Sequence, residues 1–368
     1  MTRIQHRRNL SSAALDDRCR IRPPVCPRSR FRHLQICGHN EAARSTLRVL
    51  RYLLAAEILL LATFALIGLL YERRAIQRDS QFYHPPGRLV DIRGYRLHLN
   101  CEGGGGPTVI LEYGHQGSYF DWSLVQPEIA HFTRVCYYDR AGYGWGDPSP
   151  RPRIPSVMSE ELRSLLHSAG EKPPYILVSH SYGSVNAEMF AHKYPDEVAG
   201  LVLVEGVHTF ANPEFQLADR LQLRAMQYLI SFGLPRWRHW CGGTGPQELR
   251  GEKEAVTCRP TLYDAFYRER AAFPESLVEL RAITNLGAVP LIVIARDPEI
   301  ASEHSHDDPG WDRVQQQKLQ LSKNSELVVA SGSGHDVPQV RPDLIIAAVR
   351  KLVTQASGTG GHPGNSVK

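Results

Sequence analysis

The residue best placed for chemistry in this sequence is a serine in a predicted sharp turn. Ser181 lies in the stretch SHSYG at residues 179–183, directly after a predicted buried strand and at the start of a predicted helix. Such a turn strains the serine backbone and exposes its hydroxyl, and small residues two places before and after it let neighbouring backbone pass closely. The first of these is Ser179, where glycine is commoner. The context predicts a catalytic nucleophile rather than a serine that only caps a helix.

A serine hydroxyl becomes a good nucleophile only when a base takes its proton. The sequence has sixteen histidines, and His335 follows the last predicted strand, in the loop SGSGH at residues 331–335. The glycines suit a loop that must hold an imidazole over a serine. We therefore expect His335 to be the base rather than an ordinary surface histidine. His180 and His115 are near the predicted site but occupy positions that shape the backbone.

A carboxylate is needed to orient the imidazole and to stabilise its charged form. Asp297 follows the predicted strand 290–295, and Glu205 ends the predicted strand 201–205. We prefer Asp297, because the chain order serine, acid, histidine is then the usual one for such sites and because Pro298 fixes the loop after it. Glu205 is the alternative acid, since its longer side chain can span a greater distance.

The oxyanion formed by attack on a carbonyl needs two backbone N–H donors. Tyr182, the residue after the nucleophile, is expected to supply one. The other is expected in the loop EYGHQG at residues 112–117, where Gly114 permits a turn and His115 presents its N–H. An ordinary glycine-rich connection is the alternative interpretation of this loop.

The elements that must position these residues alternate between strands and helices. A hairpin is predicted over residues 88–100, around Arg93-Gly94. Short apolar runs typical of buried parallel strands follow at residues 108–112, 134–138, 175–179, 201–205, 290–295 and 326–330. Stretches of helical period separate most of them, near residues 121–131, 157–168, 182–194 and 341–354. This alternation predicts an α/β fold with a mostly parallel sheet and helices on both faces.

The interval between the strands 201–205 and 290–295 is far longer than one crossover requires. Four stretches of helical period lie within or beside it, at residues 212–233, 246–255, 260–272 and 275–285. We expect residues 208–286 to form an inserted helical cap over the carboxyl edge of the sheet, where open α/β sheets bind ligands. The whole domain is expected over residues 86–354, followed by a flexible tail at residues 355–368.

An apolar segment precedes this domain. Residues 52–71 contain a single charge, Glu57, over about 20 residues, a length that spans the ~30 Å hydrocarbon core of a bilayer. The segment is apolar on every face, and no small-residue cleavage site follows it. We expect residues 47–74 to form a single-pass membrane anchor rather than a buried core helix. Residues 1–46 are Arg-rich and are expected to be disordered, with a transit peptide or an over-extended gene start as alternatives.

Composition and charge exclude several classes of protein. Hydrophobic residues make up 42% of the chain and charged residues 22%, which excludes a wholly disordered, collagen-like or coiled-coil protein. Residues 1–51 carry twelve Arg, no Lys and three acidic residues, a net charge of +9, and the remainder has a net charge of −4. Basic charge confined to one end argues against a nucleic-acid-binding body. The Arg excess before the apolar segment favours a catalytic domain outside the cytoplasm.

The seven cysteines show neither zinc-ligand spacing nor a dense disulfide framework. Cys241 and Cys258 both lie in the predicted cap. They could pair if the domain faces an oxidising compartment, and two free thiols are at least as good an alternative.

In these motifs the chain resembles the α/β-hydrolase superfamily, and most of all the membrane-anchored bacterial hydrolases with an N-terminal helix. The resemblance rests on GRLVD at residues 87–91, TVILE at 108–112, DRAGYG at 139–144, the turn around Ser181, YPDEV at 194–198 and the loop before His335. It covers residues 86–354, and it implies the fold, a Ser–His–acid triad and hydrolysis of an ester or related acyl bond without a cofactor or metal. Two features depart from the family pattern: Tyr113-Gly114 replaces the commoner His-Gly, and Glu205 stands where aspartate is often found.

The sequence therefore predicts a membrane-tethered serine hydrolase of the esterase or lipase type that acts on a small-molecule acyl substrate. A serine nucleophile argues against haloalkane dehalogenase and epoxide hydrolase activities, which this superfamily performs with a carboxylate nucleophile. A peptidase, a C–C bond hydrolase and a catalytically silent binding protein on the same fold are the alternatives.

Overall fold

The computed structural model describes residues 36–207, 217–241, 249–303 and 311–359. The chain divides into two units, residues 1–61 and residues 62–368, and each is described by itself. One continuous helix, α1 (Ile36–Phe82), contributes to both units.

Helix α1 is longer than the sequence suggests at both ends. It begins at Ile36, inside the segment 1–46 that was expected to be disordered, and it continues to Phe82, beyond the predicted end at residue 74. Residues 1–35 lie outside the described residues. Residues 43–82 of this helix form one candidate membrane span, whose most apolar 18-residue window has a mean hydropathy of 2.5 and is not buried by other parts of the protein.

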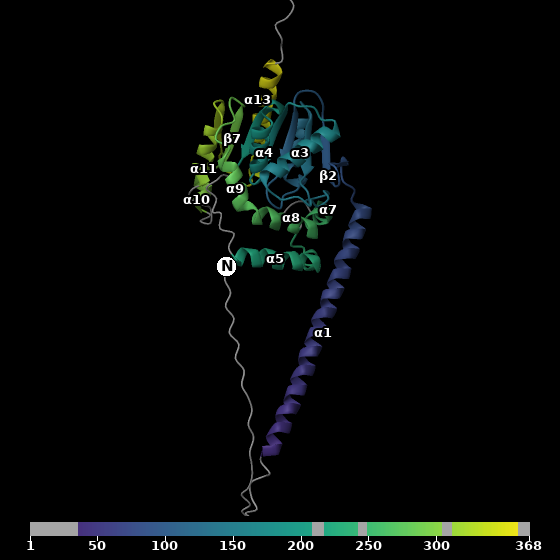
Figure 1. Cartoon of the computed structure of the whole chain (residues 1–368). Coiled ribbons are helices and arrows are strands. Elements are labelled where there is room, and N and C mark those ends of the chain that lie inside the picture. Colours follow the sequence, from purple (N-terminus) through teal and green to yellow (C-terminus); the bar gives the residue numbers. More distant parts are fainter. Residues whose placement is uncertain (1–35, 208–216, 242–248, 304–310, 360–368) are drawn as a thin grey trace, which may run out of the picture. The chain divides into compact units, whose positions relative to one another are not determined.

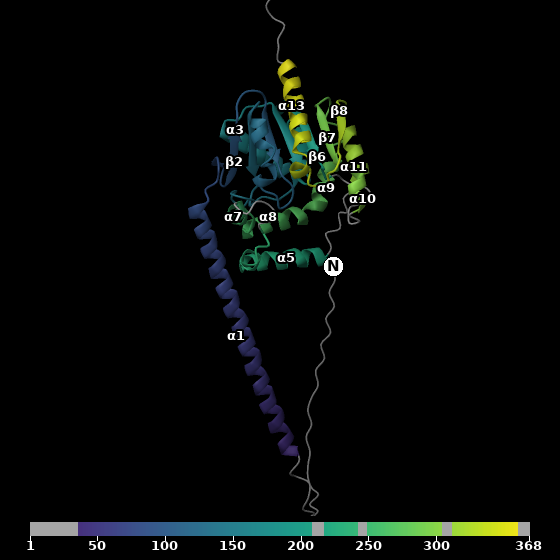
Figure 2. The ribbon, with the colours of Figure 1, turned by 180° about the vertical axis from the view of Figure 1, so that it is seen from behind.

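The second unit is built around an eight-stranded sheet with the order β1-β2-β4-β3-β5-β6-β7-β8 (Figures 1 and 2). The strands β1 and β2 form an antiparallel hairpin, β2 is antiparallel to β4, and every later pairing is parallel. The strands are β1 (Arg88–Asp91), β2 (Arg96–Glu102), β3 (Thr108–Glu112), β4 (Val135–Asp139), β5 (Tyr175–His180), β6 (Val198–Val204), β7 (Leu291–Arg296) and β8 (Ser325–Ala330). The predicted fold class is confirmed.

Helices cover both faces of the sheet (Figures 1 and 2). Successive residues of a strand point to opposite faces, so Ile110 and Leu177 pack in one core with α3 (Pro155–Ala169) and α4 (Gly183–Lys193). The neighbouring residues of the same strands pack on the other face with α2 (Gln126–Ala130) and α13 (Pro342–Thr359).

The structure corrects the predicted C-terminal boundary and adds elements near it. Helix α13 extends to Thr359, so the tail expected at residues 355–368 is helical over its first five residues, and residues 360–368 are not described. Two helices and a short 3-10 turn between β7 and β8 were not predicted; they are α10 (Pro298–Glu303), α11 (Trp311–Lys318) and η4 (Leu319–Leu321).

Among the described residues between β6 and β7, where the cap was expected, the structure has five α-helices. They are α5 (Leu217–Ser231), α6 (Leu234–Trp237), α7 (Arg250–Thr257), α8 (Pro260–Ala271) and α9 (Phe273–Arg281). Both ribbon views show α8 next to the carboxyl edge of the sheet and α5 beyond it (Figures 1 and 2). We call the described residues of α5–α9 the cap.

Within the described ranges, the structure contains one disulfide bond in the cap and one in the sheet. Cys241 and Cys258 are joined within the cap, which resolves the alternatives left by the sequence. Cys101 and Cys136 are joined across β2 and β4, where they face each other in the strand register. The second bond was not expected, because β3 lies between these strands in the sequence and only the sheet order makes them neighbours.

We predict that the full chain, isolated without reductant, yields two cross-linked peptide pairs in a non-reducing peptide map, Cys101 with Cys136 and Cys241 with Cys258. Thiol counting of the denatured, non-reduced chain should then find no more than three of the seven cysteines free. Seven free thiols would contradict both bonds.

Candidate active site

Ser181 lies at the tight turn between β5 and α4, as its sequence context predicts. Its φ angle is +52°, a left-handed conformation that a residue with a side chain rarely adopts. Neighbouring backbone passes close by: a Cβ on Gly183 would lie 2.8 Å from the carbonyl oxygen of Glu112, and one on Gly114 would lie 2.9 Å from the Ser181 Cβ. Glycine at these two positions therefore lets the end of β3 lie directly beside Ser181.

His335 reaches this serine from the loop between β8 and α12 (Val337–Val340). Its Nε2 lies 3.0 Å from Ser181 Oγ, within hydrogen-bond distance. The Nε2–H of His180 donates to the backbone carbonyl of His335 at 2.9 Å and so holds this loop in place. Burial, and secondarily the neighbouring His335, lower the pKa of His180 to about 3, so its ring is neutral at ordinary pH.

Glu205, and not Asp297, is the carboxylate beside the imidazole. Glu205 Oε2 lies 3.3 Å from His335 Nδ1, and Oε1 accepts the backbone N–H of Arg296 at 2.8 Å. The Glu205 side chain is fully buried, and its backbone has a φ of +48° just after β6. This strained position directs a long side chain across the end of β7 toward the histidine loop.

The structure thus places Glu205, and not the preferred Asp297, within hydrogen-bond distance of His335, and the reason is local. The Asp297 carboxylate accepts backbone N–H groups from Gly332 and Glu299, both at 2.9 Å, which lower its pKa below the usual value. It is thus occupied in bracing the turn at the end of β7 and the first residues of the histidine loop. The order of the residues along the chain made Asp297 a candidate. Its carboxylate is instead hydrogen-bonded to these two backbone N–H groups and not to His335.

The two predicted oxyanion donors belong to loops that touch each other. The rings of His115 and Tyr182 are stacked, with centroids 3.6 Å apart. Among the described residues, neither backbone N–H has a protein acceptor. The structure thus brings together Ser181, His335 and the loops of both donors.

Arg140 is a buried residue that holds residues 112–117, the predicted oxyanion loop, and that was not predicted to have a role. Its guanidinium donates to the carbonyl of Tyr113 at 2.6 Å and to that of Gly114 at 3.0 Å. The C=O and the following N–H of a trans peptide point in opposite directions, so the bond to Gly114 turns the His115 N–H away from Arg140. The available signal was the DRAGYG motif, which was recognised as part of the resemblance but given no role.

Two buried carboxylates surround this guanidinium. Glu269 of α8 pairs with Arg140 Nε at 3.1 Å and accepts the hydroxyl of Tyr143 at 2.7 Å. Glu112 lies 3.5 Å from Arg140 and accepts two hydrogen bonds from the side-chain amide of Asn186. Burial raises the pKa of Glu112 to about 7 despite the nearby arginine. The cap is thereby connected to the oxyanion loop through Glu269.

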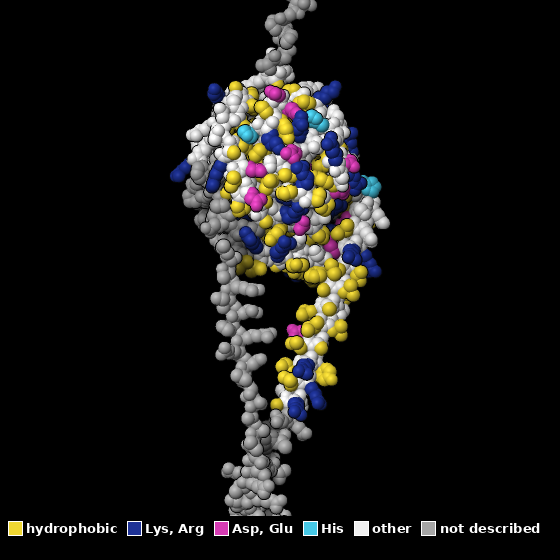
Figure 3. All heavy atoms as spheres, viewed as in Figure 1, with side chains coloured by type: hydrophobic (Ala, Val, Ile, Leu, Met, Phe, Trp, Pro, Cys, Tyr) yellow, Lys and Arg dark blue, Asp and Glu magenta, His cyan; other side chains and the backbone are white. Residues whose placement is uncertain are grey.

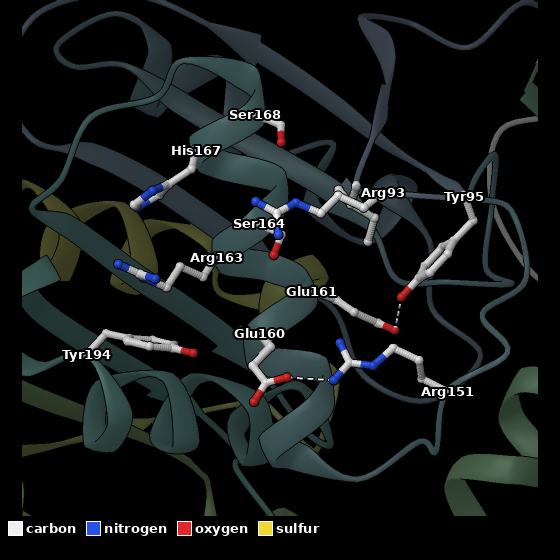
Figure 4. A pocket seen from close by; sticks show the side chains of 11 residues that line it. Arg93, Tyr95, Arg151, Glu160, Glu161, Arg163, Ser164, His167, Ser168 and Tyr194 are labelled. Atoms are coloured by element: carbon white, nitrogen blue, oxygen red, sulfur yellow. Dashed lines mark hydrogen bonds and ion pairs between the residues drawn. The ribbon is translucent and has the colours of Figure 1, made fainter.

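Two other groups of polar or metal-ligating side chains lie apart from these residues. Cys101, Cys136 and Glu171 form a cluster with metal-ligand geometry, but the two sulfurs are joined to each other and are not available as thiolates. A polar hollow beside α3 contains an ion pair of Arg151 with Glu160 and a hydrogen bond from the Tyr95 hydroxyl to Glu161 (Figure 4).

Comparisons with known proteins agree with this architecture. An AB hydrolase superfamily protein of Gibberella zeae is 29% identical over 280 residues, which are 67% of this chain and 86% of that protein. The solved structure of epoxide hydrolase CorEH matches with a TM-score of 0.57 and 20% identity, over 73% of this chain and 98% of its own. A thermophilic esterase from Thermogutta terrifontis matches with a TM-score of 0.54 and 20% identity, over 71% of this chain and 94% of its own.

The sequence pattern of the Alpha/beta hydrolase family matches residues 97–348. This match covers more than half of the chain and includes the serine, glutamate and histidine described above. The chain therefore belongs to the alpha/beta hydrolase family.

Proposed function

We propose that this protein is a serine hydrolase that cleaves an ester or related acyl bond. The observation that carries the proposal is the contact of 3.0 Å between Ser181 Oγ and His335 Nε2, continued by 3.3 Å from Nδ1 to Glu205. A base within hydrogen-bond reach of a serine, itself held by a buried carboxylate, is the arrangement that activates a hydroxyl for attack.

In the proposed reaction Ser181 Oγ attacks the acyl carbonyl carbon while His335 Nε2 takes its proton. Glu205 accepts the Nδ1–H of the imidazole, which keeps Nε2 free as the base and stabilises the imidazolium that forms. The protonated histidine then gives its proton to the leaving alcohol or amine, and an acyl-enzyme remains. Water, deprotonated by the same histidine, attacks the acyl-enzyme and releases the acid and the free serine.

The oxyanion of each tetrahedral intermediate is proposed to bind the N–H groups of His115 and Tyr182. Two observations support this choice: both amides lack an acceptor among the described residues, and Arg140 fixes the peptide plane that carries the His115 N–H. Donors held in place before the reaction stabilise the developing charge without further rearrangement.

A serine at this position also bears on the epoxide hydrolases among the structural matches. In the proposed mechanism the acyl group is transferred to the hydroxyl oxygen of Ser181. Epoxide opening by a carboxylate nucleophile would require an aspartate or glutamate at this turn, and this chain has a serine there. The fold likeness to epoxide hydrolase CorEH is thus compatible with acyl chemistry at Ser181.

Replacing the nucleophile should abolish activity without unfolding the protein. Ser181→Ala is expected to lose both fluorophosphonate labelling and ester turnover, the latter by about a million-fold, because no oxygen remains to attack. The matched control is Ser179→Ala, since the buried Ser179 hydroxyl has no hydrogen-bond partner among the described residues. Labelling of Ser181→Ala equal to that of the wild type would overturn the proposal.

The acid is tested by two single substitutions on one p-nitrophenyl ester. Glu205→Gln should lower kcat by about ten-thousand-fold, because it removes the charge that holds the imidazole tautomer. Asp297→Asn should stay within about tenfold of the wild type, because that side chain does not contact His335. Circular dichroism of both variants checks their folding. A greater loss for Asp297→Asn would return the catalytic role to that residue.

We further propose that residues 52–71 anchor the chain in a membrane and that the catalytic domain lies outside the cytoplasm. The apolar side chains of this segment are exposed, and Leu53, Leu60 and Phe64 are each more than half accessible. Lipid would cover this surface while the helix satisfies its own backbone. Two disulfides support an oxidising compartment for the domain.

The anchor is tested by carbonate extraction of membranes that contain the full chain. The wild type should stay in the pellet, whereas the double variant Leu60→Arg, Phe64→Arg should be released, because each arginine near the middle of a span costs about 2.5–3.5 kcal/mol. The variant Leu60→Ile, Phe64→Leu is the matched control and should remain in the pellet. Release of the wild-type chain would rule out a membrane span.

A further inference from the structure

The cap exposes a set of large apolar and aromatic side chains on its outermost helices. Each of them is more than half exposed, and we call them the apolar cap face: Leu217, Leu221, Tyr228, Trp237 and Trp240. Those of α5 recur with helical spacing and so lie on one side of it, while Ile230 on the opposite side is buried. Figure 3 shows hydrophobic side chains gathered along this edge of the domain. Large apolar side chains that are exposed together along one edge of a domain indicate a binding partner.

Residues 68–79 of α1, which belong to the second unit, pack against the cap. Residues 72, 75 and 79 of α1 are buried and lie on one side of the helix because they recur every three or four positions. Nearer the apolar segment, Gly68 lies so close to α5 that a Cβ there would collide with the carbonyl of Phe232. A Cβ on Gly233 would in turn lie 2.6 Å from the ring of Tyr71.

A buried arginine holds the two elements together. Arg236 of α6 lies between Glu72 and Asp79 of α1, with its Nε 3.1 Å from Glu72 and its Nη1 2.6 Å from Asp79. All three side chains are almost completely buried. Removing Arg236 would leave two buried carboxylates without their cationic partner, so this residue holds the cap on residues 68–79 of the helix.

These contacts set the position of the cap along residues 62–71, the part of the apolar segment that belongs to the second unit. Gly68 precedes the end of the segment, Tyr71, by three residues, or about 4.5 Å along a helix. The end of α5 therefore lies slightly inside the boundary between apolar and charged residues of α1. Both ribbon views show α5 running across the direction of residues 62–82, not along it (Figures 1 and 2). A helix that lies in a membrane surface has this orientation, with its apolar side about 5–10 Å deep.

The residues around the face have the chemistry of a membrane interface. Tyr and Trp are favoured at the level of the lipid headgroups, and three of the five residues of the apolar cap face are Tyr or Trp. The guanidinium of Arg238 lies 5.4 Å from the ring of Trp240. Exposed arginines also follow the apolar segment directly, at Arg73, Arg74 and Arg78, where they would meet lipid phosphates.

We propose that the apolar cap face rests on the same bilayer that residues 52–71 cross, with its aromatic side chains among the headgroups and upper acyl chains. This inference rests on the proposed anchor. The occupant of the face is lipid, because the face continues from the apolar segment through the packed contacts of Gly68 and Tyr71.

The test uses the full chain in vesicles of phosphatidylcholine and phosphatidylglycerol whose acyl chains are brominated, since bromine quenches tryptophan fluorescence only at short range. Trp122 and Trp145 are buried inside the domain, whereas Trp237 and Trp240 are exposed on the cap. We expect strong quenching of the wild type and loss of most of it in the double variant Trp237→Phe, Trp240→Phe. The matched control Trp145→Phe should retain the quenching.

A second pair of variants tests the depth argument. Gly68→Leu should separate the cap from α1 and reduce the quenching by more than half, while Ala62→Leu, on an exposed side of the helix, should not. Flotation and fluorophosphonate labelling are measured on every variant. A chain that does not float overturns both the anchor and the lipid-bound face. A chain that floats and is labelled but shows no bromolipid quenching overturns the face alone, and protection of its tryptophans from acrylamide would then assign the face to a second copy of the chain.

Discussion

The hydrogen bonds and the ion pair of the buried Arg140 guanidinium join the sheet, the predicted oxyanion loop and the cap. The arrangement of these three parts depends on them. The guanidinium donates to the carbonyls of Tyr113 and Gly114 and pairs with Glu269 of α8. A buried charge is tolerated only when such acceptors surround it, and removing one partner typically costs about 3–5 kcal/mol. Because one side chain serves both the loop and the cap, neither can change position without leaving charges or carbonyls unsatisfied.

This sharing makes the cap part of the proposed catalytic site and not only a cover over it. Glu269 lies 3.5 Å from the ring of His115, the residue whose backbone N–H is the proposed oxyanion donor. Burial, and then Arg140, lower the pKa of His115 well below its usual value, so its ring is neutral and adds no charge beside the guanidinium. A cap that shifted with substrate would move Glu269, and through Arg140 it would move the peptide plane that carries the proposed oxyanion donor.

The sequence predicted what is encoded locally and failed where distant segments meet. The alternation of apolar runs defined the sheet, and the turn around Ser181 and the loop before His335 carry their own positional signals. The acid could not be chosen in this way, because the choice depends on backbone N–H groups of Gly332 and Glu299 that occupy Asp297. Likewise Glu72 and Asp79 look like solvated charges after an apolar helix, and their partner Arg236 is 164 and 157 residues away.

Two buried arginines therefore hold the cap at two separate helices. Arg140 binds α8 to the loop beside the nucleophile, and Arg236 binds α6 to the helix that leads into the apolar segment. Since both contacts are buried, the cap transmits the position of α1 to the site more rigidly than an exposed loop would. If α1 crosses a bilayer, these two ion-pair networks fix the distance between the membrane surface and Ser181. A substrate dissolved in lipid would then have to move the same distance from the membrane to reach the serine.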